Sequence, residues 1–202
     1  ECHADALVLR HYDEDATERA VSVASIPLIN AGNGAGEHPT QALLDLYTIS
    51  KERGGIDGLT VTLMGDLKHG RTVHSLVKLL RMYDVKVNFV SPQELSMPSS
   101  YLMSGDSEYL DLDPIIEDTD ILYVTRVQRE RLADTMVIDF SYAVTRDDMD
   151  RAKNNMVLMH PLPRVGEIPP ELDSDPRAAY FRQMKYGLHV RMALLVSMIG
   201  RD

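Results

Sequence analysis

The sequence predicts an α/β protein in which helices flank a parallel β-sheet. Short apolar runs, as long as buried strands, alternate with longer segments whose apolar residues recur at helical spacing. Strands that alternate with helices form right-handed βαβ units, and these units place their strands parallel in one sheet. Ligands of such sheets bind outside the carboxyl ends of the strands, so polar residues at those ends are the first candidates for a site.

The predicted elements follow one another along the chain in this alternating order. Short apolar runs predict six strands: ALVLR (6–10), IPLIN (26–30), LTVTLMGD (59–66), VKVNFV (85–90), DILYVTR (120–126) and MVLMHPLP (156–163). Apolar residues at helical spacing predict three helices, at 40–53, 71–83 and 188–200. The apolar face is expected to hold Leu43, Leu44, Tyr47 and Ile49 in the first helix, and Val73, Leu76, Leu79, Leu80 and Tyr83 in the second. Two polar segments, 91–114 and 164–180, are predicted as loops.

Composition excludes several classes of function. The chain has 202 residues, a net charge of −10 and one cysteine, Cys2. An acidic chain is unsuited to nonspecific nucleic-acid binding, which needs a basic surface. A single cysteine allows neither an internal disulfide nor a cysteine-based metal cluster. The sequence has no apolar run near the roughly 18 residues of a membrane span, and a cytoplasmic setting is the expectation.

The first motif is NAGNGAGEHPTQ (30–41), where a strand is expected to meet a helix. A dinucleotide-binding loop would require a third glycine where the chain has Glu37, so this interpretation is rejected. Pro39 suits the first turn of a helix, which places His38 and Gln41 near its N-terminus. There the helix dipole lowers the pKa of an imidazole, and a neutral histidine can donate an N–H to an oxyanion. The alternatives are a flexible glycine turn and an ordinary helix cap.

Two further motifs offer cations at predicted strand ends. Arg71 opens a helix after the strand at 59–66, where it could bind a carboxylate or a phosphate. Arg126 and Gln128 follow the strand at 120–126 and are two residues apart, so in an extended segment both side chains reach the same side. The alternatives are solvated loop charges for Arg71 and surface ion pairs for Arg126.

The fourth motif is MHPLPRV (159–165), in which a strand ends in His-Pro-Leu-Pro. Because Pro161 and Pro163 lack an N–H, the segment cannot continue a β-ladder, and its carbonyls can accept hydrogen bonds from an NH₂ group. The alternative is a turn that only ends the strand. All four motifs lie at the same edge of the predicted sheet, and three of them carry cations or neutral donors that suit a small, oxyanion-rich substrate.

Taken in order, GEHPTQALLDLYTI (36–49), MGDLKHGRTVHSL (64–76), YVTRVQRERL (123–132) and MHPLPRVGEI (159–168) resemble the motifs of aspartate carbamoyltransferases. DSDPRAAYFRQM (173–184) is similar to the form fused into the multienzyme of animal pyrimidine synthesis. The resemblance implies transfer of the carbamoyl group of carbamoyl phosphate to the amino group of L-aspartate. It implies no metal and no cofactor, and catalysis by positioning and by electrostatic stabilisation of an oxyanion.

The resemblance also implies roles for individual residues. Arg10 resembles an arginine that contacts carbamoyl phosphate, and His38 a histidine that donates to its carbonyl oxygen. Gln41 and the backbone carbonyls of Pro161 and Leu162 resemble the groups that bind the carbamoyl NH₂. The residues that resemble those gripping the two carboxylates of aspartate are Arg71, Arg126 and Gln128.

A Rossmann-like aspartate-binding domain is implied for residues 50–186, with residues 1–49 as part of a carbamoyl-phosphate-binding domain and 187–202 as a helix returning to it. The family's Ser-Thr-Arg-Thr phosphate cradle and lysine loop have no counterpart in the sequence, so we expect an excerpt of a longer polypeptide with little activity alone. The family also implies a homotrimer with shared active sites, and fusion to carbamoyl-phosphate synthetase and dihydroorotase is an option.

Two alternatives remain open. An ornithine carbamoyltransferase would share the fold, but that group usually has His-Cys-Leu-Pro where this chain has His-Pro-Leu-Pro (160–163). A cationic ornithine side chain would also not suit Arg126 and Gln128. The second alternative is a non-catalytic module of the same fold that serves as an oligomerisation unit, against which the retained site residues argue.

Overall fold

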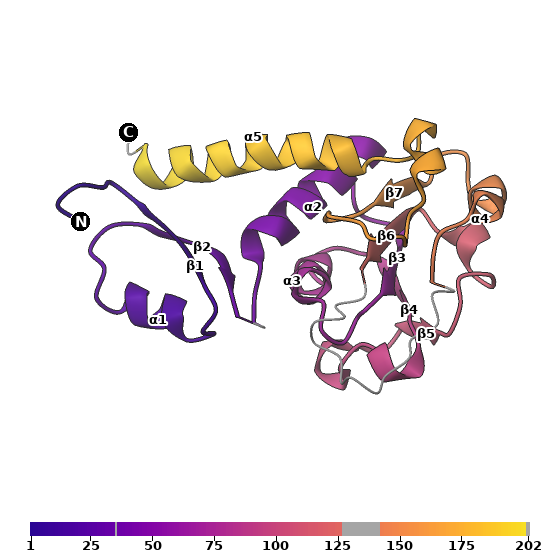
Figure 1. Cartoon of the computed structure of the whole chain (residues 1–202), viewed down its shortest axis with the longest axis horizontal. Helices are drawn as coiled ribbons and strands as arrows, with labels where there is room; N and C mark the ends of the chain where they lie inside the picture. The colour runs from indigo at the N-terminus through magenta and orange to yellow at the C-terminus, as the bar shows by residue number, and fades with distance from the viewer. Residues whose placement is uncertain (35, 127–141, 201–202) are drawn as a thin grey trace.

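The computed structural model describes residues 1–34, 36–126 and 142–200. A small lobe holds β1 (Leu7–His11), α1 (Ala16–Val21) and β2 (Leu28–Asn33), and a larger lobe holds the remaining strands (Figure 1). In the small lobe β1 and β2 pair in parallel, with Leu7 opposite Leu28. Within the described part of the chain, no helix has both the length and the apolar character needed to cross a membrane.

The larger lobe is built on a five-stranded parallel sheet with the order β5-β4-β3-β6-β7. The strands are β3 (Thr60–Gly65), β4 (Lys86–Val90), β5 (Ser107–Tyr109), β6 (Ile121–Thr125) and β7 (Val157–Met159). Neighbouring strands run in parallel throughout, since β3 pairs with β4 and β6, and β6 pairs with β7. The α/β class with parallel sheets flanked by helices, predicted from the alternating pattern, is confirmed.

Apolar cores cover both faces of this sheet. Side chains that alternate along β3, such as Leu63 and Met64, enter opposite cores. One core includes Ile49 of α2 (Pro39–Arg53) and Leu76 of α3 (Arg71–Leu80). The other includes Met149 of α4 (Arg146–Arg151). Strands covered on both faces read as continuous apolar runs, which explains why these runs were visible in the sequence.

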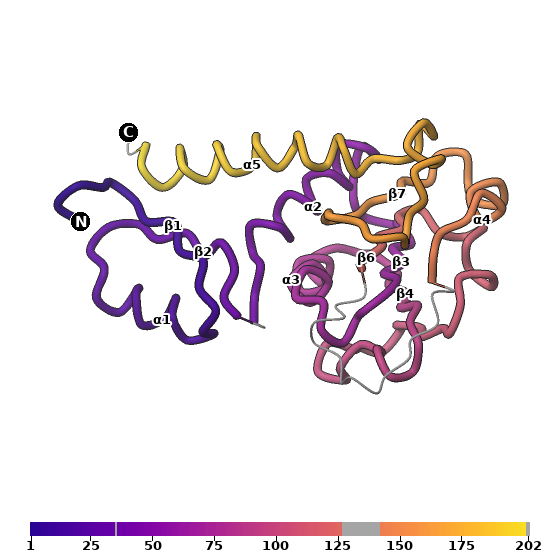
Figure 2. The backbone as a smooth tube through the Cα atoms, viewed as in Figure 1, coloured from indigo at the N-terminus to yellow at the C-terminus, as the bar shows by residue number. Residues whose placement is uncertain are grey.

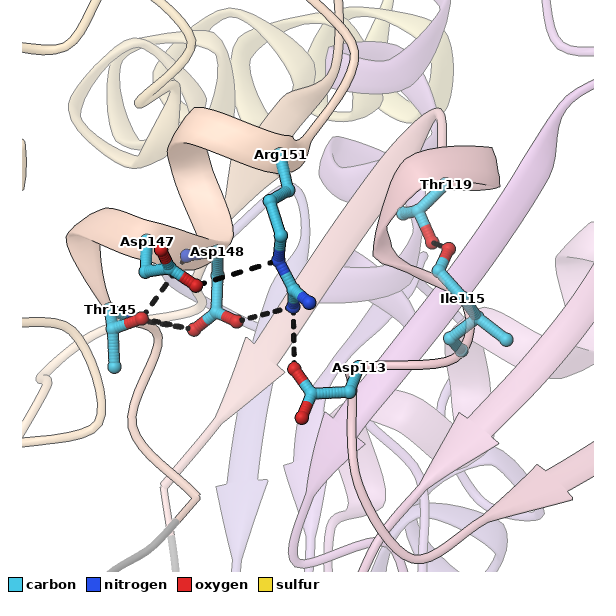
Figure 3. Close-up of polar contacts among 7 residues, drawn as sticks. All are labelled: Asp113, Ile115, Thr119, Thr145, Asp147, Asp148 and Arg151. Atoms are coloured by element: carbon cyan, nitrogen blue, oxygen red, sulfur yellow. Dashed lines mark hydrogen bonds and ion pairs between the residues drawn. The ribbon is translucent and has the colours of Figure 1, made fainter.

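Polar contacts are found at both ends of α4, which packs on one face of the sheet (Figure 3). Thr145 and Asp148 form a reciprocal capping box, in which the Thr145 side chain accepts from the Asp148 N–H. Arg151 at the other end of α4 pairs with Asp113 at 2.5 Å and with Asp147 at 3.6 Å. These charges are partly exposed, so the ion pairs add little stability and the cap contributes more.

Helix α5 (Tyr180–Ile199) runs beside α2, and its second half extends back towards the small lobe (Figures 1 and 2). Close approach of the two helices is possible because Gly187 has no side chain: a Cβ there would lie 3.0 Å from Leu44 Cδ2 and 2.6 Å from an Arg191 nitrogen. Beyond Gly187 the apolar side chains of Leu188, Met192 and Val196 are more than half exposed.

The predicted elements agree with the structure apart from the differences that follow. The predicted helix 188–200 is only the second half of α5, because the first half carries polar residues that hid its periodicity. The loop predicted at 164–180 leads directly into α5, which begins at Tyr180. Strand β5 lies inside the loop predicted at 91–114, and the short helices α1 and α4 were not predicted. In α2, Leu43 and Tyr47 are each 37% exposed rather than inward-facing.

Candidate active site

The carboxyl ends of β3, β6 and β7 meet at one edge of the sheet. Gly65 at the end of β3 lies opposite Thr125 at the end of β6, and Tyr123 lies opposite Met159 at the end of β7. Gly65 has a φ of +119°, and a Cβ at this position would stand 2.1 Å from the Thr125 carbonyl oxygen. Only glycine permits this closeness, which brings the segments after β3 and β6 together.

His38 occupies the N-cap of α2, directly before Pro39. Its backbone N–H donates to Ser75 Oγ at 2.9 Å, so α3 of the larger lobe holds it in place. Burial and, to a smaller extent, the nearby charges of Arg71, Arg10 and Arg191 together lower the pKa of His38 to about 4. The imidazole is therefore neutral at physiological pH. Its Nδ1 is buried and has no hydrogen-bond partner among the described residues.

Side chains of α3 also form hydrogen bonds to two further residues of the loop that leads to His38. Arg71 at the first position of α3 donates from Nη1 to the Gly34 carbonyl at 2.6 Å. Ser75 and Lys78 both donate to the Glu37 carboxylate. Burial tends to raise the pKa of Glu37, but these two donors lower it overall, so Glu37 is charged. The loop between β2 and α2 is thus positioned by the larger lobe.

Gln41, one turn into α2, belongs to a buried polar cluster around Asp45. The Asp45 carboxylate is completely buried. Its Oδ1 accepts from Gln41 Nε2 at 2.8 Å and from Gln183 Nε2 at 2.6 Å, and its Oδ2 accepts from the Tyr123 hydroxyl at 2.8 Å. Burial raises the pKa of Asp45 to about 7 against the opposing effect of these three hydrogen bonds.

The His-Pro-Leu-Pro segment after β7 is held by hydrogen bonds on both sides of His160. The His160 N–H donates to Gln183 Oε1 at 3.0 Å. His160 Nδ1 accepts from the Leu162 N–H at 2.8 Å, which leaves Nε2 to donate to Glu167 at 2.7 Å. Leu162 is thereby kept at a φ of +53°, a left-handed conformation that a branched side chain rarely adopts.

A cavity of about 180 Å³ lies between these groups, and its lining includes Gln41, His160, Pro161, Leu162, Gln183 and Arg191. Among the described residues, neither the Pro161 nor the Leu162 carbonyl oxygen accepts a hydrogen bond. The cavity therefore presents several hydrogen-bond acceptors close to a guanidinium group.

The structure brings most of the predicted site residues together. Gln41, Pro161 and Leu162 line one cavity, while Arg10 and Arg71 act electrostatically on His38. Arg126 follows β6 at the same sheet edge and is half-buried, and Gln128 lies outside the described residues.

Sequence reasoning missed four residues: Asp45, His160 as a structural group, Gln183 and Arg191. Asp45 carries a usable signal, since it lies one helical turn after Gln41, and Arg191 is the one cation of the apolar segment 188–200. In the described ranges, no three His, Cys, Asp or Glu side chains are arranged to hold a metal ion.

Family models match nearly the whole chain. The model described as the carbamoyl-P binding domain of aspartate/ornithine carbamoyltransferase matches residues 1–51, and that of the Asp/Orn binding domain matches residues 57–198. The aspartate carbamoyltransferase catalytic subunit of Thermoplasma acidophilum is 50% identical over 98% of this chain and 68% of its own length. The multifunctional protein pyr1-3 of Dictyostelium discoideum is 51% identical over 99% of this chain, which spans 9% of that protein.

Solved structures agree with these matches. Aspartate transcarbamoylase from Trypanosoma cruzi, in complex with aspartate and phosphate, has a TM-score of 0.89 and 47% identity, covering 98% of this chain and 65% of that one. The chain belongs to the aspartate/ornithine carbamoyltransferase family. Within that family, its similarity is to proteins named for the aspartate reaction, and this confirms the resemblance predicted from the four motifs.

Proposed function

We propose that the protein transfers the carbamoyl group of carbamoyl phosphate to the α-amino group of L-aspartate, forming N-carbamoyl-L-aspartate and phosphate in pyrimidine synthesis. The observation that carries this proposal is the cavity in which Gln41 and the carbonyls of Pro161 and Leu162 gather acceptors suited to an NH₂ group. Relatives support the choice of substrates, because the Trypanosoma cruzi enzyme has been solved with carbamoyl phosphate and aspartate.

The amino nitrogen of aspartate attacks the carbamoyl carbon, the bond from that carbon to the phosphate oxygen breaks, and the proton that the nitrogen loses passes to the departing phosphate. Neutral His38 donates an N–H to the carbonyl oxygen and stabilises the negative charge that develops there. Gln41 and the two carbonyls accept from the NH₂ group and orient it. Arg10 contributes positive charge beside the phosphate ester.

The two carboxylates of aspartate are assigned to Arg71, Arg126 and Gln128. Arg71 and Arg126 follow neighbouring strands, β3 and β6, so their guanidinium groups start from the same sheet edge. Arginine binds a carboxylate through two parallel N–H donors, which is the geometry that a dicarboxylate substrate requires. The same arrangement disfavours a cationic acceptor such as ornithine.

We further propose that residues 1–49 and 187–202 complete a carbamoyl-phosphate-binding domain around an aspartate-binding domain at 50–186, in a cytoplasmic homotrimer with shared sites. No metal or cofactor takes part. The relative pyr1-3, named as a multifunctional protein, supports a multifunctional context, and the relative from Thermoplasma acidophilum is named as a catalytic subunit.

The test is an assay of carbamoyl-aspartate formation by a protein that carries this chain together with the remaining third of the relatives' length. We expect turnover with aspartate and none with ornithine. The 202 residues alone, which span 68% of the Thermoplasma acidophilum subunit, should show little turnover. Activity with ornithine but not aspartate, or no transfer by the longer protein, would contradict the proposal.

A further inference from the structure

Asp45 connects the two halves of the cavity lining. Gln41 is on α2, Gln183 is on α5, and both side-chain amides donate to the same atom, Asp45 Oδ1, at 2.8 and 2.6 Å. Asp45 has no exposed surface, and Gln41 and Gln183 are 8% and 1% exposed, so bulk water does not compete for these bonds.

The carboxylate decides which end of the Gln41 amide faces the cavity. An amide side chain can turn over and exchange its oxygen for its NH₂ at little steric cost. Asp45 Oδ1 accepts from both amides and remains an acceptor when Oδ2 carries a proton, so Asp45 holds Gln41 Nε2 towards itself and leaves Oε1 on the opposite side. Turning Gln41 over would place two acceptors against each other inside the protein, which is strongly unfavourable.

The same carboxylate also positions the His-Pro-Leu-Pro segment on the other side of the cavity. Because Gln183 Nε2 is fixed on Asp45, Gln183 Oε1 points to the His160 N–H and accepts from it at 3.0 Å. His160 in turn accepts from the Leu162 N–H. A continuous chain of hydrogen bonds thus runs from Asp45 to the segment that presents the Pro161 and Leu162 carbonyls.

We propose that Asp45 is a positioning residue that keeps Gln41 Oε1 and the Pro161 and Leu162 carbonyls available to the cavity as acceptors, and thereby selects an NH₂ group over a methyl group on the acyl donor. This inference rests on the proposed function. Carbamoyl phosphate carries NH₂ where acetyl phosphate carries CH₃, and the two are otherwise nearly the same size. A methyl group leaves the acceptors of the lining unpaired, and a site built for hydrogen bonds rejects such an analogue strongly.

The experiment measures kcat/KM with carbamoyl phosphate and with acetyl phosphate in the full-length protein, and the ratio of the two values is the readout. We expect Asp45→Ala to lower this ratio at least about tenfold, because Gln41 becomes free to turn over. Asp45→Asn should keep the ratio within about threefold, since the amide oxygen can replace Oδ1 while its NH₂ donates to the Tyr123 hydroxyl oxygen.

Asp120→Ala is the matched control. Asp120 is also buried and also accepts several hydrogen bonds, from Arg53, Lys153 and the Thr60 N–H, but it lies at the opposite edge of the sheet. Its loss should reduce stability and leave the ratio unchanged. If Asp45→Ala does not fold, Gln183→Met decides, because it removes the link to His160 and should lower the ratio at least about threefold.

An unchanged ratio in folded Asp45→Ala, or in Gln183→Met when Asp45→Ala does not fold, overturns the inference. A fall of the same size in Asp120→Ala also overturns it, because the effect would then follow from general destabilisation. If the unsubstituted protein transfers neither group to aspartate, the proposed function fails instead. The two failures are therefore distinguishable.

Discussion

Replacement of Asp45 by asparagine should change how the stability of the protein depends on pH. Burial raises the pKa of Asp45 from 3.8 to about 7. Between these values the folded state holds a proton that the unfolded state has released. The contribution of Asp45 to stability is therefore fully present below about pH 4 and is lost as the pH rises through 7.

The size of the effect follows from the shift. About three pKa units correspond to roughly 4 kcal/mol of unfolding free energy, at about 1.4 kcal/mol per unit. Asparagine has the same shape and does not titrate. The variant should therefore gain up to about 4 kcal/mol relative to the unsubstituted protein between pH 4 and pH 8.

The lowered pKa of His38 changes the unfolding free energy with pH in the opposite direction. A measurement on one protein would therefore not isolate the contribution of Asp45. The pKa of His38 is lowered from 6.5 to about 4, so the unfolded state binds the extra proton in this range and stability falls as the pH falls. The two groups offset each other in the unsubstituted protein, whereas the difference between the two proteins isolates the contribution of Asp45.

Urea unfolding followed by far-ultraviolet circular dichroism at several pH values between about 4 and 8 gives this difference. The two proteins should have equal m-values, which confirms that they unfold in the same way. A difference in unfolding free energy that stays constant across this range would refute the reasoning, because the carboxyl group would then have the same pKa in both states.

Three other substitutions give separate tests. His38→Ala in the full-length protein should lower kcat roughly 10²–10³-fold with little change in KM, and an effect on KM alone would indicate ground-state binding. In the unsubstituted protein kcat/KM, which reports the free enzyme, should show no inflection from His38 above about pH 5. Arg126→Ala should raise the KM for aspartate roughly 10- to 150-fold, from about 1.5–3 kcal/mol for a charge-assisted contact, and an unchanged KM would exclude its assigned role. Gly65→Ala should destabilise the protein by more than about 2 kcal/mol, measured by urea unfolding, because its Cβ would stand 2.1 Å from the Thr125 oxygen. Gly55→Ala, which meets no atom within 4 Å, is its control, and equal effects of the two would contradict the steric argument.

The sequence predicted the sheet well because its central strands are buried on both faces. β6, for example, consists of five buried residues and appears as one uninterrupted apolar run. β5 has only three residues, Ser-Glu-Tyr, at the edge of the sheet, and it gives no such signal. Helix α4 is short and polar, although Thr145 and Asp148 already had the spacing of a capping box.

The site was predicted in part for the same physical reason. Residues that follow strands could be placed at one edge, because parallel strands end together. The buried face of α2, by contrast, also carries Thr40, Gln41, Asp45 and Thr48, so apolar periodicity placed Leu44 and Ile49 correctly but turned Leu43 and Tyr47 inward. Which donors meet the Asp45 carboxylate depends on where α5 lies, and local sequence patterns do not contain that contact.

The low pKa of His38 keeps the imidazole from being protonated when the anionic substrates of the proposed reaction bind beside it. Arg10, Arg71 and Arg191 attract anions to the site, and an anion that binds beside His38 raises the pKa of the imidazole by roughly 1–3 units. A histidine with an ordinary value of 6.5 would then become protonated near neutral pH. From a starting value of about 4, the same rise brings the pKa of His38 to about 5–7, so the imidazole is largely neutral above pH 7. Burial and the arginines that attract the substrate therefore together keep the proton off the imidazole to which we assign the N–H that donates to the carbonyl oxygen.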